Sequence, residues 1–169
     1  SLERAWYIWI YNVFIGEIVM PSYSQKSLDE LGTANMLLQN LFNVVIQYVD
    51  CTILFGNRPK DLQFEFFKKG RTLSGSGEWF ISNKAEVVTY KDGYNNPSMH
   101  NYTPSKAVDA VSYPIDWEDV SQAYYFAGIV KGIAIMMGIK IRWGGDFNRN
   151  NQVADENFKD LYHFELVED

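Results

Sequence analysis

The chain has 169 residues with 21 acidic and 15 basic side chains, a formal charge of −6. Apolar residues make up 47% of it, too many for a disordered chain, and the length suits one domain with a sizeable core. The single cysteine excludes an internal disulfide framework and a CxxC zinc ribbon, and the net negative charge without a Lys/Arg block argues against nucleic-acid binding. With only two histidines, an imidazole-based metal site would need nearly all of them.

Residues 5–20 (AWYIWIYNVFIGEIVM) form an apolar and aromatic run that Asn12 and Glu17 interrupt. A membrane span needs about 20 apolar residues, so this run is too short and too polar for a stable one. Only Arg4 gives it a basic start, and it lacks an A-x-A cleavage site. We expect a strand or helix packed on the body, or residues upstream of a natural start at Met20. An uncleaved export anchor is the alternative.

The next part of the chain predicts two helices and a buried strand. Residues 24–31 carry a Ser27-x-x-Glu30 capping-box pattern, and Thr33 is a candidate cap for the helix that follows. The β-branched run 51–55 predicts a buried strand.

The middle of the chain contains more turn residues. Pro59 suits the start of a helix that continues to about Lys69, and the Gly/Ser content of residues 70–77 predicts a loop. Residues 84–91 (KAEVVTYK) predict an edge strand, and residues 92–105 are rich in Gly, Asn and Pro and predict a loop.

The last third predicts a long buried helix among strands. The helix covers residues 123–139, with Asp116 as its N-cap and Gly138 at its C-terminal end. Strands are expected at 107–111, 140–143 and 162–166, and a long polar loop at 144–160. This order predicts an α+β fold, a small antiparallel sheet with helices packed on it. We expect one domain over residues 24–169, preceded by an extension, residues 1–23, of unknown role.

Both histidines lie in segments that contain an aspartate and adjoin a predicted strand. His100 belongs to residues 98–109 (SMHNYTPSKAVD) and His163 to residues 160–166 (DLYHFEL). Two imidazoles and a carboxylate, with a fourth position left to water, are the ligand set of a hydrolytic zinc site. A lone histidine is more often an ordinary surface or core residue, and the chain has no HExxH helix. Spacing alone therefore leaves both interpretations open.

The two segments resemble the signature of the zinc D,D-peptidases and L-alanyl-D-glutamate endopeptidases that cut peptidoglycan stem peptides. That superfamily has an S-x-H, then an A-x-D, and later an acid-x-x-H on a strand. Here these motifs read Ser98-Met99-His100, Ala107-Val108-Asp109 and Asp160-Leu161-Tyr162-His163.

The resemblance is strongest to the bacteriophage endolysin branch, which is D-alanyl-D-alanine carboxypeptidase-like (VanY-like), and it covers residues 24–167. Further matching blocks are residues 24–31, Gly56-Asn57-Arg58 with Gln63 downstream, residues 141–147 (IRWGGDF) and residues 163–166 (HFEL). The chain departs from the commonest pattern in a longer interval between His100 and Asp109 and in Ser105, where glycine is usual.

By this resemblance His100, Asp109 and His163 bind Zn²⁺. Asp109 alternates with Val108 along the predicted strand, so one faces the cleft while the other faces the core. Asp160, expected on the same strand three residues before a ligand, would be the general base and then the proton donor to the leaving amine. A solvated acid at the start of the strand is the alternative for Asp160.

Three further residues receive roles by the same resemblance. Arg58 would stabilise the carbonyl oxyanion or hold a substrate carboxylate, the alternative being a surface arginine at a helix start. Glu165 shares a face with His163 and would support that ligand or contact substrate. Ser98 would hydrogen-bond the substrate or only shape its turn.

The resemblance implies a zinc metallopeptidase that hydrolyses an amide bond of the peptidoglycan stem peptide, an L-alanyl-D-glutamate endopeptidase acting as a phage endolysin. Two alternatives are a D-alanyl-D-alanine carboxypeptidase and a non-catalytic, zinc-containing wall-binding module. We expect a monomer whose partner is the stem peptide, with no nucleic acid and no stable membrane span. It would reside in the host cytoplasm before lysis and act on the cell wall, self-export through residues 5–20 being the alternative.

Overall fold

The computed structural model describes residues 20–167 of the chain. The prediction for residues 5–20 thus lies outside the described residues, apart from Met20, and the boundary at residue 23 stays a prediction. Within residues 20–167, no helix combines the length and apolar character needed to cross a membrane.

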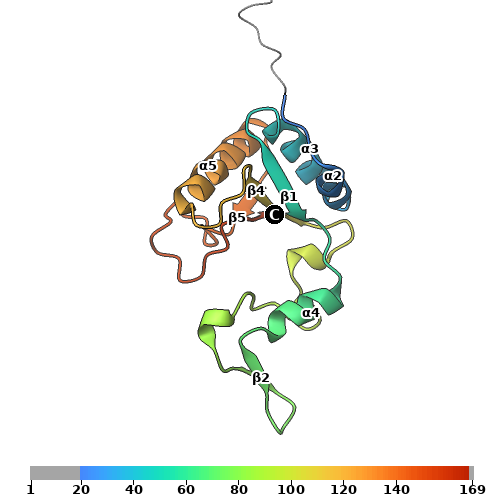
Figure 1. Ribbon diagram of the computed structural model, residues 1–169, viewed down its shortest axis with the longest axis vertical. Coiled ribbons are helices and arrows are strands. Elements are labelled where there is room, and N and C mark those ends of the chain that lie inside the picture. The colour runs from blue at the N-terminus through green and yellow to red at the C-terminus, as the bar shows by residue number, and fades with distance from the viewer. Residues whose placement is uncertain (1–19, 168–169) are drawn as a thin grey trace, which may run out of the picture.

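A four-stranded antiparallel sheet forms the centre of the molecule (Figure 1). Its strands, in spatial order, are β1 (Cys51–Phe55), β4 (Ala107–Ser112), β6 (His163–Leu166) and β5 (Ile141–Trp143). All four strands lie where the sequence predicts them, with ends shifted by a residue or two. The prediction of an α+β fold with a small antiparallel sheet is confirmed.

Three helices cover the sheet and build the core with it. They are α2 (Gln25–Gly32), α3 (Met36–Val45) and α5 (Val120–Met136). Phe42 of α3 and Phe126 of α5 both meet Phe164 of β6 edge to face, with ring centroids 5.7 and 6.0 Å apart. Side chains alternate along β6, so while Phe164 packs into this core, the neighbouring His163 and Glu165 face the other side of the sheet.

The predicted helices exist, but their N-caps differ from those predicted. Ser24, not Ser27, caps α2, accepting the Ser27 N–H at 3.2 Å. Ser27 is instead buried against β1, where its Oγ accepts the Ile53 N–H at 3.1 Å. The same correction applies at the other two helices, where the caps are Asn35 instead of Thr33 and Asp119 instead of Asp116. Gly138 ends α5 as expected, with a φ of 67°.

An arm extends away from the sheet between β1 and β4 (Figure 1). It contains α4 (Lys60–Lys68), the hairpin strands β2 (Arg71–Leu73) and β3 (Trp79–Ile81), and the 3₁₀ turns η1 (Lys84–Glu86) and η2 (Met99–Asn101). The loop predicted at 70–77 is therefore wrong in part, because its first half pairs in the hairpin. The edge strand predicted at 84–91 is also wrong, because Asn83 caps a 3₁₀ turn there and no described strand pairs with the rest.

Candidate active site

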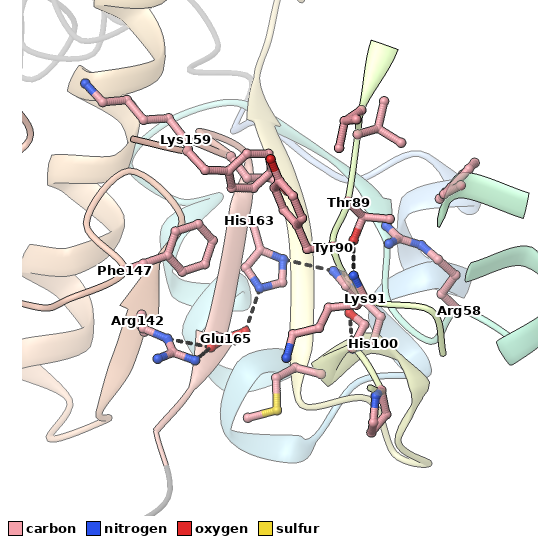
Figure 2. Close-up of a pocket in the computed structure, with 18 of the residues that line it drawn as sticks. Arg58, Thr89, Tyr90, Lys91, His100, Arg142, Phe147, Lys159, His163 and Glu165 are labelled. Carbon is pink, nitrogen blue, oxygen red and sulfur yellow. Dashed lines mark hydrogen bonds and ion pairs between the residues drawn. The ribbon is translucent and has the colours of Figure 1, made fainter. Parts of the chain in front are cut away.

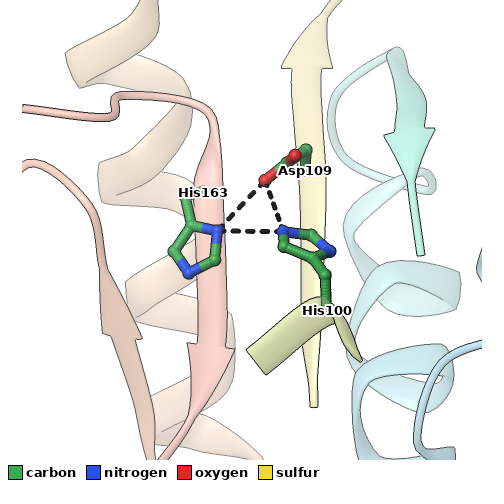
Figure 3. A group of neighbouring side chains, drawn as sticks. All are labelled: His100, Asp109 and His163. Atoms are coloured by element: carbon green, nitrogen blue, oxygen red, sulfur yellow. Dashed lines mark hydrogen bonds and ion pairs between the residues drawn. The ribbon is translucent and has the colours of Figure 1, made fainter. Parts of the chain in front are cut away.

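Strand register brings together two of the three predicted ligands. Asp109 of β4 and His163 of β6 are directly opposed in the antiparallel pair, and His100 approaches from η2 (Figure 3). His100 Nε2 lies 2.9 Å from Asp109 Oδ1 and 3.1 Å from His163 Nδ1. Asp109 Oδ1 and His163 Nδ1 are also 3.1 Å apart. The structure thus gathers three side chains separated by up to 63 positions into one possible metal-binding group.

The turn after β1 fixes His100. The Arg58 N–H donates to the His100 carbonyl at 2.8 Å, and the Asn101 side chain donates to the Arg58 carbonyl at 2.8 Å. This turn lies so close to α2 that a Cβ at Gly56 would be 2.1 Å from the Glu30 carbonyl oxygen, which explains the glycine. η2 is therefore docked on a rigid turn rather than on a free loop.

Hydrogen bonds on the outer side of each imidazole set its tautomer. His100 Nδ1 lies 2.7 Å from the Gly56 carbonyl, which can only accept, so Nδ1 carries the proton. His163 Nε2 likewise donates to the Glu165 carboxylate at 2.7 Å. Each neutral ring then presents an unprotonated nitrogen toward the Asp109 carboxylate. When both rings are neutral, three acceptors converge with no donor between them, an arrangement that a metal ion or a shared proton must satisfy.

The separations suit a tetrahedral metal ion. Zinc–ligand bonds of 2.0–2.2 Å would place neighbouring ligand atoms about 3.3–3.6 Å apart, only slightly more than the observed 2.9–3.1 Å. Without a metal, a proton takes its place. Burial alone would lower the pKa of His163, but the hydrogen bonds to Asp109 and Glu165 raise it to about 10. Burial alone would likewise raise the pKa of Asp109, yet the two imidazoles hold it far below its ordinary value.

Arg58 holds the other oxygen of the aspartate. Its Nη2 lies 2.7 Å from Asp109 Oδ2, and its Nη1 donates to Gln63 Oε1 at 3.0 Å. The guanidinium also lies over the rings of Phe55 and Phe66. With 9% of its surface exposed, Arg58 is not a surface arginine, so that alternative is wrong. These contacts leave only Oδ1 of Asp109 free to face the two imidazoles.

Asp160 lines the cleft beside the three residues, but it is not on the strand as predicted. It precedes β6 by a two-residue turn, and its N–H donates to the Gly144 carbonyl at 2.8 Å. A Cβ at Gly144 would lie 2.1 Å from the Asp160 carbonyl oxygen, so this contact requires glycine. Burial, and then the nearby charge of Asp109, raise the pKa of Asp160. No side-chain hydrogen bond occupies this carboxylate within residues 20–167.

The outer contacts of the site include residues that sequence reasoning assigned no role. Glu165 accepts a hydrogen bond from Arg142 Nε at 2.6 Å, and the two residues are register partners across β5 and β6. Ser98 Oγ accepts the His100 N–H at 3.3 Å, which favours its turn-shaping role. In the sequence, Arg142 and the buried Gln63 stand out only as parts of the matching blocks. Their partners are set by the register of the sheet and by the docking of the arm, which the sequence alone does not give.

A cleft of about 750 Å³ opens beside the three residues, between the arm and the sheet (Figure 2). Arm residues 87–91 form one wall and Phe147, Phe158 and Lys159 of the long loop form the other. Among the described lining residues, five are cationic and two are acidic, although the whole chain is acidic. The cationic residues are Arg58, Lys69, Lys91, Arg142 and Lys159. The cleft thus suits an anionic ligand.

Comparison with known proteins settles the family. A family model described as phage L-alanyl-D-glutamate peptidase matches residues 20–167. The chain belongs to this family. This peptidase is therefore a hydrolase of the peptidoglycan stem peptide, as the sequence motifs predict, and its family acts on the cell wall.

The fold of the peptidase is also found among solved structures. The crystal structure of the Serratia marcescens L-Ala D-Glu endopeptidase ChiX matches with a TM-score of 0.61 and 21% identity, covering 90% of this chain and 95% of that one. This likeness concerns the fold. No curated protein matches the chain.

The close approach of Gly144 to Asp160 leads to a first prediction. Gly144→Ala should displace Asp160 by the order of an ångström and lower turnover about 100-fold while leaving the metal content unchanged. Gly128→Ala is the matched control, because Gly128 lies within α5 with nothing within 4 Å of its added Cβ. Turnover, metal content and thermal unfolding are measured on both. Full turnover in folded Gly144→Ala would show that this contact does not position Asp160.

Proposed function

We propose that the chain is a zinc-dependent L-alanyl-D-glutamate endopeptidase that acts as a phage endolysin. The observation that carries the zinc proposal is the convergence of His100 Nε2, Asp109 Oδ1 and His163 Nδ1, three acceptors within 3.1 Å of one another at the end of a cleft. Two imidazoles and one carboxylate leave a fourth tetrahedral position for water or substrate, as in catalytic zinc sites.

The residues around the triad have the chemistry for amide hydrolysis. Zinc bound there supplies a Lewis acid for water and for the substrate carbonyl. Asp160 takes the proton from the attacking water on its free carboxylate and returns it to the leaving amine. Arg58 fixes Asp109 through Oδ2, and its positive charge at the cleft wall favours negative charge on the carbonyl oxygen or a substrate carboxylate.

Two residues have supporting roles in this proposal. Glu165, itself paired with Arg142, orients His163 by accepting its Nε2 proton, so that Nδ1 faces the metal position. Ser98 holds the turn that carries His100, and it is also one of the residues that line the cleft.

The charge of the cleft supports a peptide substrate with carboxylates. An acidic chain is repelled from an anionic wall at long range, but Lys69, Lys91 and Lys159, which are not paired with an acid in the described part of the chain, attract a carboxylate-bearing stem peptide to the cleft. We propose that the peptidase acts as a monomer and accumulates in the host cytoplasm before lysis. The D-alanyl-D-alanine carboxypeptidase and the non-catalytic wall-binding module are the alternatives that the experiments below separate.

The role of Asp160 is tested by Asp160→Asn. The variant should retain about one zinc per chain and lose about 100-fold or more in turnover, because it removes a base and not a ligand. Asp155→Asn is the control, since Asp155 is an exposed acid of the same loop that does not line the cleft. Zinc content is measured by atomic absorption beside turnover of solubilised wall. An Asp160→Asn protein as active as the wild type would exclude this residue as the base.

The bond that is cut is identified by mass spectrometry of digested muropeptides. An endopeptidase should release the stem peptide after its first L-alanine, leaving that alanine on the sugar. Release of free D-alanine would contradict this and favour the carboxypeptidase. Zinc bound without any turnover, in a protein whose His100→Ala variant loses the metal, would favour the non-catalytic module.

A further inference from the structure

The arm contributes a segment, residues 88–90, that follows the extended Val87, bends at Tyr90 and belongs to no helix or strand of the described part of the chain. Of its backbone groups, Val88 N–H and C=O, Thr89 N–H and C=O, and Tyr90 N–H make no hydrogen bond within residues 20–167. These residues follow the 3₁₀ turn η1, and no described strand pairs with them. Unpaired backbone of this kind is a template for pairing with another chain.

The side chains of the segment alternate as they do in a strand. Val88 and Tyr90 are 47% and 45% exposed, while Thr89 between them turns inward and accepts a hydrogen bond from Gln63 Nε2 at 3.3 Å. All three residues line the cleft, and Figure 2 labels Thr89 and Tyr90. These residues therefore belong to the wall of the same cleft that ends at the three converging acceptors.

Buried Gln63 fixes this wall relative to the metal position. Its Nε2 donates to the Lys91 carbonyl at 2.9 Å, and its Oε1 accepts from Arg58, which in turn holds Asp109. On the other side, the ring of Tyr90 meets Phe158 edge to face at 5.4 Å, in the loop that carries Asp160. The segment is thus connected through Gln63 and Arg58 to a candidate ligand, and by the Tyr90–Phe158 contact to the loop of the candidate base.

We propose that residues 88–90 bind the stem peptide as an added strand, with main-chain N–H and C=O groups of the substrate paired to those of Val88 and Thr89. This inference rests on the proposed function. Main-chain pairing gives affinity without reading side chains, so it holds an extended peptide in register while the scissile amide reaches the triad. Val88 and Tyr90, on the exposed side of the segment, then contact the side chains of the bound peptide.

The test uses the native zinc-loaded protein and synthetic stem peptides in which one non-scissile amide at a time is replaced by an ester. An ester keeps the shape but removes one N–H donor. At one or two positions the ester should lower kcat/KM about 3- to 10-fold through a higher KM, the loss expected for one hydrogen bond. Esters cleaved like the all-amide peptide at every position would overturn the added strand and leave the proposed function intact. Failure to cleave the all-amide peptide would overturn both.

A pair of variants tests the protein side of the same contact. Val88→Pro removes the backbone donor and should raise KM for the all-amide peptide about 10-fold, whereas Val88→Ala keeps the donor and should raise it less. In Val88→Pro the sensitive ester should cost less than it does in the wild type, because both changes disrupt the same pairing. If the ester raises KM by the same factor in Val88→Pro as in the wild type, the two changes act independently. Proline would then act through the fold, and the added strand would be contradicted.

Discussion

The convergence of three acceptors at one point is the constraint on which the rest of the site depends. Two unprotonated imidazole nitrogens and a carboxylate oxygen repel one another unless a cation lies between them. The outer contacts all act to keep them there. Gly56 and Glu165 take the ring protons, and Arg58 occupies the second aspartate oxygen. The fold thus maintains an arrangement that a proton on His163 satisfies in the empty site and that a metal ion can satisfy in its place.

The sheet and the arm contribute different residues to this site. The sheet sets the triad through register, since Asp109 and His163 are cross-strand partners and Phe164 between the cleft-facing residues anchors β6 in the core. The arm supplies His100 and three of the five cationic residues of the cleft, and its Arg58, held by Gln63, contacts Asp109 of the sheet. The net charge of the chain therefore says little about its ligand, because most of the acidic residues lie elsewhere and cationic residues outnumber acidic ones in the cleft.

Much of the fold and of the candidate site follows from the sequence, and the exceptions have physical causes. The strands were predictable from β-branched runs, and the ligand motifs from their resemblance to the peptidase family. The helix caps were misplaced because several polar residues precede each helix, and only packing selects one: Ser27 is drawn into β1, which leaves Ser24 as the cap. The strand at 84–91 was mispredicted because propensity does not reveal whether a partner strand exists. Arg142 and Gln63 emerge only from register and docking.

The most direct test of this account is the protonation state of the two histidines in the zinc-loaded protein, read from ¹⁵N chemical shifts at neutral pH. With only two imidazoles in the chain, the spectrum is assigned with one His→Ala variant. We predict that His100 carries its single proton on Nδ1 and His163 on Nε2, with the other nitrogen of each ring bound to metal. A doubly protonated His163, or a ring with the opposite tautomer, would contradict the claim that these three acceptors hold the ion.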